Sequence, residues 1–264
     1  MERRREPLPT RVQDTPSLPT AYVDALDRGL AELGLELTAD ARAAIDGHAR
    51  LLLAWTSAIN LTAIREPAAI ALGHVTDSLS GHALISATRP RRLLDLGSGG
   101  GYPGFPLAAA LGSADGAWHP DVTLLEPIGK KARFLTTVAE ATGLAGRVRV
   151  EQRRAEDLAG DRGAESWDVV TARAVASTAD LVELAFPLLT PGGSLIAWKR
   201  GDLEAELAAA ERAIDELGGG RLQVIGVEVD GLVGHLLVVA SRGQRGTSPT
   251  GYPRDPAERS RAPW

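Results

Sequence analysis

Residues 93–104 constrain the fold more than any other part of this sequence, and they read Leu-Leu-Asp-Leu-Gly-Ser-Gly-Gly-Gly-Tyr-Pro-Gly. A short apolar run is followed by a glycine-rich turn, and a segment of helical length comes after the turn. This order is typical of a strand, a nucleotide-binding loop and a helix. We therefore expect the loop to lie at the carboxyl end of a strand, where open α/β sheets bind their ligands.

The chain beyond residue 91 alternates short apolar runs with amphipathic segments of helical length. Such alternation predicts an α/β, Rossmann-like fold whose mostly parallel sheet carries helices on both faces. Two last runs, about 221–229 and 235–241, flank Asp230-Gly231 and predict an antiparallel hairpin at the sheet edge. The other strands are expected at 93–96, 122–125, 148–150, 169–171 and 194–198, and helices near 104–112, 130–142, 178–189 and 202–217.

Four segments are expected along the chain: an N-terminal tail (1–19), a helical segment (20–88), the sheet-bearing domain (89–242) and a basic C-terminal tail (243–264). Both tails are rich in Pro, Arg, Ser and Gly and lack apolar periodicity, so we expect them to be mobile. Within the helical segment, Thr20 and Thr38 are expected to cap two helices, and a third helix is expected after Pro67.

Composition excludes several classes of protein. The 264 residues include no cysteine, which rules out disulfides, thiolate nucleophiles and cysteine-ligated metals, and the histidines lack a zinc-binding pair. We expect no metal, no membrane association and, without a secretory signal, a cytoplasmic protein, with a monomer as the default. The net charge of −5 combines an acidic body with basic ends, unlike a strong non-specific nucleic-acid binder.

The glycine loop admits two ligands. Gly99, Gly101 and Gly104 match the G-x-G-x-x-G spacing of an NAD-dependent oxidoreductase. Asp95, followed by Gly97, Gly99 and Gly101, matches the acidic pattern of S-adenosylmethionine (SAM) methyltransferases. A carboxylate about 4–6 Å away would oppose a pyrophosphate but would favour the cationic ammonium and sulfonium of SAM. Asp95 therefore favours SAM.

Three further features are expected around the same ligand. Glu126 ends the second strand, where a carboxylate can accept the ribose hydroxyls of a nucleoside. Ala155-Glu156-Asp157 follows the third strand, at the place where SAM folds bring backbone and acidic groups against the adenine. Arg173 ends a buried strand and is therefore expected at the ligand-binding edge of the sheet.

The order and spacing of these motifs resemble the ribosomal RNA small subunit methyltransferase G family, also called RsmG or GidB. The resemblance runs from about Trp55 to Ser241. It rests on Asn60-Leu-Thr62, His74-Val-Thr-Asp77-Ser78, the loop 94–106 with its unusual Pro103-Gly104 and Pro106, Gly129-Lys130-Lys131-Ala-Arg133, Arg154–Asp157, Thr171–Ala174 and Trp198-Lys199.

The resemblance implies a SAM-dependent methyltransferase domain that methylates N7 of guanine-527, in the 530 loop of 16S rRNA. Its partner would be the small ribosomal subunit or an assembly intermediate. The positions that match the family's SAM contacts are Gly97, Tyr102, Ala155, Glu156 and Arg173. Tyr102 stands where many members have leucine or phenylalanine.

Guanine N7 carries a lone pair and no proton, so its methylation needs no general base. We expect catalysis to come mainly from orientation, which contributes about 7–11 kcal/mol in good cases. Candidate positioning residues are His74, Asp77 and Arg173, and candidate RNA-binding residues are Lys130, Lys131, Arg133, Lys199 and Arg200. Two alternatives stay open at this point: the NAD-dependent oxidoreductase and an RNA-binding module that transfers no methyl group.

Overall fold

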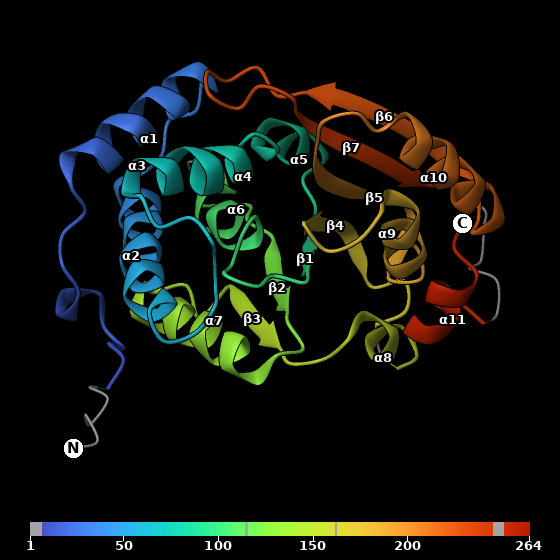
Figure 1. Ribbon diagram of the computed structural model, residues 1–264, viewed down its shortest axis with the longest axis horizontal. Helices are drawn as coiled ribbons and strands as arrows, with labels where there is room; N and C mark the ends of the chain where they lie inside the picture. Colours follow the sequence, from blue (N-terminus) through green and yellow to red (C-terminus); the bar gives the residue numbers. More distant parts are fainter. Residues whose placement is uncertain (1–6, 114–115, 162, 245–250) are drawn as a thin grey trace.

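The computed structural model describes residues 7–113, 116–161, 163–244 and 251–264. At its centre lies a seven-stranded sheet in the order β3-β2-β1-β4-β5-β7-β6 (Figure 1). Strands β1 to β5 pair in parallel, whereas β7 pairs antiparallel with both β5 and β6. The expected Rossmann-like fold with an antiparallel edge hairpin is confirmed. The strands are β1 (Arg92–Leu96), β2 (Asp121–Leu125), β3 (Val148–Glu151), β4 (Trp167–Arg173), β5 (Leu189–Arg200), β6 (Gly220–Gly226) and β7 (His235–Arg242).

Successive side chains along the inner strands enter two different cores, one on each face of the sheet. On β1, Leu93 joins a core formed with α1 to α7, while Leu94 and Leu96 join a core formed with α8 to α10. The described helices and helical turns are η1 (Val12–Asp14), α1 (Thr20–Glu32), α2 (Ala39–Thr56), α3 (Pro67–Ile70), η2 (Ala71–Thr76), α4 (Asp77–Leu79), α5 (His82–Thr88), α6 (Gly104–Ala110), α7 (Gly129–Ala141), α8 (Ala155–Ala159), α9 (Thr178–Ala185), α10 (Glu204–Glu216) and α11 (Pro256–Arg261).

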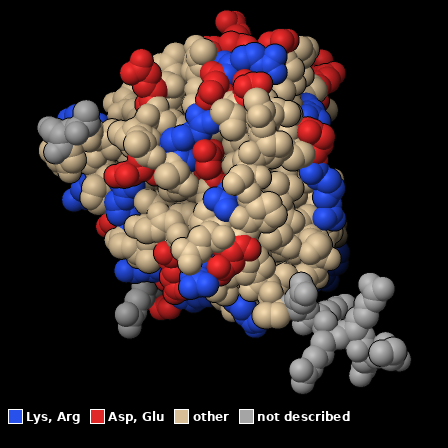
Figure 2. Space-filling model, turned by 90° about the vertical axis from the view of Figure 1, so that its left-hand side faces the viewer, with Lys and Arg blue, Asp and Glu red and all other residues tan. Residues whose placement is uncertain are grey.

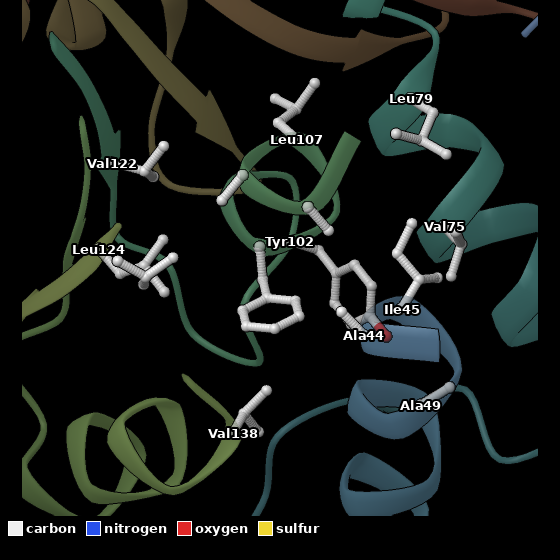
Figure 3. Close-up of a cluster of buried hydrophobic side chains, with 14 of the residues drawn as sticks. Ala44, Ile45, Ala49, Val75, Leu79, Tyr102, Leu107, Val122, Leu124 and Val138 are labelled. Atoms are coloured by element: carbon white, nitrogen blue, oxygen red, sulfur yellow. The ribbon is translucent and has the colours of Figure 1, made fainter. Parts of the chain in front are cut away.

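The N-terminal helices share a hydrophobic core with the sheet. Figure 3 shows Tyr102, from the glycine loop, lying beside Ala44 and Ile45 of α2, with Val75 and Leu79 from the next helical turns close by. All five side chains are at most 6% exposed. The helical segment therefore packs directly on the glycine loop and can supply one wall of any site that the loop forms.

Two of the three helix starts expected in this segment agree with the structure. The Oγ1 atom of Thr38 accepts a hydrogen bond from the amide of Ala41 at 3.2 Å, and Pro67 opens α3. The expectation for Thr20 was wrong, because α1 already includes it and Pro19 occupies the cap position without a capping side chain. There the backbone carbonyl of Pro19 accepts from the first turn instead.

The described parts of both tails make polar contacts with the body. The indole of Trp55 in α2 donates to the carbonyl of Pro9 at 2.7 Å. At the other end, the fully buried Glu183 of α9 accepts from Arg254 Nη2 at 2.6 Å and from the Trp264 indole at 2.8 Å. The sequence predicts mobile tails because they lack apolar periodicity. Hydrogen bonds and ion pairs of this kind leave no periodic pattern in the sequence. Residues 1–6 and 245–250 lie outside the described residues.

The surface carries charges of both signs. Seen from the side of α1 and α2, basic and acidic groups are intermingled, and no broad field of one sign covers this face (Figure 2). In the described ranges, no helix has both the length and the apolar character needed to cross a membrane.

Gly104 opens α6 and allows this helix to lie directly against β1 and β2. A Cβ at this position would lie 2.5 Å from the Cβ of Asp95 and 2.6 Å from a methyl group of Leu124. We expect Gly104→Ala to lower the free energy of unfolding by about 1–3 kcal/mol, because the core has no room for the added methyl group. Urea unfolding measures this effect. Gly146→Ala is the matched control, since its Cβ would meet nothing within 4 Å; equal effects at the two positions would contradict the packing argument.

Candidate functional site

The glycine loop connects β1 to α6 through alternating left-handed residues. Gly97, Gly99 and Gly101 have φ values of 70°, 54° and 93°. Side chains other than glycine rarely adopt these values, which accounts for the spacing of the three glycines. The amides of Gly97 and Ser98 both donate to the carbonyl of Leu125, at 2.9 and 3.0 Å, so the loop is fastened to the end of β2.

Two carboxylates support this loop from the protein interior. Glu126 is 4% exposed and accepts from the amides of Gly99 at 2.9 Å and Ile128 at 2.8 Å. Asp95 is completely buried and accepts from the Thr171 hydroxyl at 2.8 Å, and no described residue forms a hydrogen bond with its Oδ2 atom. Burial raises the pKa of the Asp95 carboxyl to about 6. The acidic pattern of the loop predicts that this carboxylate faces a cationic ligand, whereas in the structure it lies beneath the loop.

A pocket of about 560 Å³ opens above the carboxyl ends of β1, β4 and β5. Helical turns η2 and α4 form one wall, and the glycine loop forms its floor. Of the residues predicted from sequence, those lining the pocket are His74, Asp77, Gly97, Gly99, Tyr102, Lys131, Arg173, Lys199 and Arg200. Those outside its lining are Asp95, Gly101, Glu126, Lys130, Arg133, Ala155 and Glu156.

The N-terminal wall contains a π-helical turn, η2. The sequence predicted one continuous helix after Pro67, but the chain passes from α3 through this wider turn into α4. Such turns often occur at functional sites, because they redirect side chains and free a backbone carbonyl. Here the carbonyl of Gly73 accepts a hydrogen bond from Arg173 at 3.2 Å, so the turn contacts the sheet directly.

Arg173 is the cation at the centre of the pocket. Its Nη1 atom donates to Asp77 Oδ2 at 2.8 Å and to Gly73, and its Nη2 atom contacts Nδ1 of His74 at 3.1 Å. The guanidinium also lies over the Tyr102 ring, 5.4 Å from its centre. A guanidinium has five N–H donors. Three are engaged by described residues, which leaves two for a ligand in the pocket.

His74 is held as a neutral imidazole. Because an arginine can only donate, Nδ1 of His74 must accept from Arg173, and Nε2 must carry the proton that it shares with the Thr62 hydroxyl at 2.7 Å. Burial and the Arg173 charge lower the pKa of His74 to about 3. Its ring stacks on Tyr102, which stacks in turn on the buried His48, with centroids 4.7 and 4.5 Å apart.

Sequence reasoning missed two residues that complete the pocket, Trp198 and His235. The Trp198 indole donates to the backbone carbonyl of Asp77 at 2.6 Å. His235 Nδ1 lies 2.8 Å from Asp77 Oδ1, and its Nε2 atom accepts from Arg200 at 3.0 and 2.8 Å. From the sequence, Trp198 was assigned only to a family motif, and His235 belongs to no motif. The strand register is the signal that could have found them, because it pairs Trp198 with Arg173 and His235 with Arg200, two residues farther along β5.

The basic candidates fall into two groups. Lys199 is tied into the protein, since its ammonium donates to the Ala176 carbonyl at 2.8 Å and pairs with Glu206. The start of α7 is different: in the described part of the chain, no ion pair involves Lys130, Lys131 or Arg133. This second group offers unpaired charge to an approaching anion, and so does Arg200, whose side chain contacts the imidazole of His235 and forms no ion pair with a described residue.

Ala155 and Glu156 lie farther along the same edge, after β3. The sequence predicted a loop here, whereas the structure has the short helix α8. Ala155 is buried, and Glu156 pairs with Arg259 of α11 at 2.5 Å. The C-terminal arm therefore holds one of the residues that the family resemblance assigns to the cofactor.

Comparison with known proteins gives a consistent family. Residues 42–230 match the model of the GidB family, described as rRNA small subunit methyltransferase G. A ribosomal RNA small subunit methyltransferase G from Symbiobacterium thermophilum is 36% identical over 240 residues, covering 89% of this chain and 95% of the relative. One from Dehalococcoides mccartyi is 37% identical over 228 residues, covering 86% and 93%.

Solved structures support the fold. An O-methyltransferase from Bacillus cereus, determined in complex with SAH, aligns with a TM-score of 0.54 and 19% identity over 75% of this chain and 91% of its own. An O-methyltransferase family protein from Burkholderia thailandensis aligns with a TM-score of 0.51 and 15% identity over 86% and 70%. The sequence matches decide between the two interpretations of the glycine loop, against the oxidoreductase. The chain belongs to the rRNA small subunit methyltransferase G (GidB) family of SAM-dependent methyltransferases.

Proposed function

We propose that this chain transfers the methyl group of SAM to N7 of guanine-527, in the 530 loop of 16S rRNA, by in-line displacement without a general base. One observation carries the proposal: the carboxylate and the two imidazoles that line the pocket, those of Asp77, His74 and His235, already have hydrogen-bond partners. Asp77 is held by Arg173 and His235, and neutral His74 uses both ring nitrogens. A reaction that removed a proton would need one of these groups free.

N7 methylation makes no such demand, because the nitrogen attacks with a lone pair and loses no proton. SAM supplies a methyl group activated by the positive sulfonium. The chain's contribution is to hold the cofactor and the purine in line, an arrangement that suits the rigid pocket wall of stacked rings and ion pairs. The wall is built from His74, Tyr102 and Arg173.

The residues that line the pocket, together with those next to it along the same edge of the sheet, fit SAM. The two remaining N–H donors of Arg173 can take the cofactor's carboxylate, which planar guanidinium groups bind in a bidentate manner. From the described residues Glu126 accepts two hydrogen bonds of the roughly four that a carboxylate can take, so it can also receive ribose hydroxyls. Ala155 and Glu156 would lie against the adenine of the cofactor. Asp95 would act indirectly, by supporting the loop from below.

We place RNA contact on Lys130, Lys131 and Arg133 at the start of α7, with Arg200 at the other side of the pocket mouth. Lys199 would act through its ammonium only after leaving Glu206. The substrate would be the small ribosomal subunit or an assembly intermediate, which places the enzyme in the cytoplasm.

Removal of charge at α7 tests the RNA surface. We expect Lys131→Gln to weaken binding to small subunits. The slope of log K against log salt concentration should fall by about one unit, because binding with one phosphate contact fewer releases about one counterion fewer. Lys130→Gln and Arg133→Gln are expected to act in the same way. Filter binding at several salt concentrations measures the slope. Arg212→Gln, on α10 behind the opposite face of the sheet, is the control, and an unchanged slope for all three α7 variants would move the RNA elsewhere.

The proposed reaction is tested by methyl transfer from labelled SAM to small subunits that lack the modification, with naked 16S rRNA in parallel. Borohydride and aniline then cleave the RNA at N7-methylguanosine, and the break is mapped. A single new break at guanine-527 is the expected result. If the RNA became labelled but no break appeared at guanine-527, the chain would still be a SAM-dependent methyltransferase, but the proposed atom or site would be wrong. No label on either substrate would favour a binding module without transferase activity.

A further inference from the structure

His235 lies outside every motif that the sequence analysis singled out, yet it joins two parts of the pocket. The sheet register pairs Arg173 with Trp198 between β4 and β5, and Arg200 with His235 between β5 and β7. Because Trp198 and Arg200 are two residues apart on one strand, all four side chains lie on the same face of the sheet. That face is covered by α4, which carries Asp77.

The partners of His235 fix its tautomer. Arg200 can only donate, so His235 Nε2 accepts from its Nε and Nη2 atoms, and the ring proton must lie on Nδ1. This Nδ1–H donates to Asp77 Oδ1 at 2.8 Å, while Arg173 occupies Asp77 Oδ2 at 2.8 Å. The side chains of His235 and Asp77 are 10% and 4% exposed, so water has little room to replace either bond.

Asp77 is therefore held from two sides, and its orientation determines that of Arg173. With the Nδ1–H donor removed, Oδ1 would be a buried, unpartnered carboxylate oxygen, which costs about 1–3 kcal/mol and favours rotation of the group. Rotation would release the contact that aims the two spare N–H donors of Arg173 into the pocket. His235 would in this way act on the ligand through two other side chains.

We propose that His235 is a positioning residue for methyl transfer, which fixes the Asp77 carboxylate and through it the Arg173 guanidinium that receives SAM. The inference rests on the proposed function in that it uses Arg173 as the cofactor's anchor. The edge hairpin, which carries no residue of the glycine loop, would thereby contribute to the affinity for the cofactor.

Three substitutions separate the two hydrogen bonds of the ring. His235→Ala removes both, His235→Asn keeps an N–H donor near the Nδ1 position, and His235→Gln places its amide nearer the Nε2 position. Calorimetric titration with SAM, in the absence of RNA, is the primary measurement. We expect SAM to bind about tenfold more weakly to the Ala and Gln variants, and within about twofold of wild type to the Asn variant. His119→Asn, on an exposed histidine before β2, is the matched control.

Kinetics on small subunits provide the second measurement. For His235→Ala, the KM for SAM should rise with the dissociation constant, while kcat at saturating SAM changes less than about threefold, as for a loss of uniform binding. An Ala variant with wild-type affinity, or a Gln variant that binds as well as the Asn variant, would overturn the inference. The binding measurement needs no RNA, so it remains decisive even if cleavage mapping moves the methylated atom away from N7.

Discussion

Arg173→Ala is expected to reduce kcat/KM by about 10²–10⁴-fold, measured at low SAM and low subunit concentrations. Two charge-assisted hydrogen bonds to the cofactor would be lost, each contributing about 1.5–3 kcal/mol. The side chain is 15% exposed, so water would replace those bonds poorly. Unchanged methylation rates would remove Arg173 from the site.

A stability effect must be separated from this loss of activity. Removing Arg173 strands Asp77, which is 4% exposed, and breaking a buried ion pair in this way costs about 3–5 kcal/mol. The double variant Arg173→Gln with Asp77→Asn leaves no buried charge unpaired, and it should fold while staying inactive. Arg173→Lys should recover part of the affinity, because an ammonium keeps the charge but not the planar fork. Arg92→Ala, at the opposite end of β1, is expected to leave the rate unchanged.

The framework of the fold could be predicted because each of its parts follows from local pattern. Apolar runs separated by amphipathic segments gave all seven strands to within a few residues at most ends, and the glycine spacing gave the loop. Most of the strand 189–200 beyond its apolar centre was missed, since Thr190, Pro191 and Gly192 belong to turns in sequence terms. The short helices α8 and α11 also escaped, because five or six residues show no helical period.

The site was predicted less completely, for a physical reason. Arg173 and the loop could be placed because strand ends and glycine turns lie at one edge of a parallel sheet. His235 lies at the pocket only because β7 pairs antiparallel with β5 in a register that sets His235 opposite Arg200, and no single sequence motif encodes that register. Asp95 and Glu126 were assigned to the ligand from their position in sequence. Their position in the sequence does not reveal that Glu126 accepts hydrogen bonds from two backbone amides, or that Asp95 accepts one from a threonine hydroxyl.

Acid is expected to destabilise the protein through its buried histidines. Burial lowers the pKa of His48 to about 4, and burial together with Arg173 lowers that of His74 to about 3, from an ordinary value of 6.5. An imidazole with a lower pKa in the folded state binds more protons when unfolded. The free energy of unfolding therefore falls as the pH drops below about 6.5, by about 3 kcal/mol per histidine at pH 4.

Asp95 acts in the opposite direction. Its pKa is raised to about 6 in the folded protein, so the folded state binds more protons than the unfolded state between about pH 4 and 6, and acid adds roughly 3 kcal/mol from this group. The two histidines outweigh the one carboxyl. For these three groups together we expect a loss of roughly 3–4 kcal/mol in the free energy of unfolding between pH 7 and pH 4, and urea unfolding at a series of pH values measures the direction of the change.

Substitution of His48 isolates its share of this effect. His48 is fully buried and lies 2.7 Å from the carbonyl of Gly100, so it ties α2 to the glycine loop. His48→Gln can keep a donor to this carbonyl but cannot titrate, so the variant should be less stable at pH 7 yet lose about 3 kcal/mol less on acidification. His119→Gln, on an exposed imidazole, should leave the pH dependence unchanged. Parallel pH profiles for His48→Gln and wild type would mean that the pKa of His48 is not lowered by folding, and the acid sensitivity would then have to arise from His74 or from other groups.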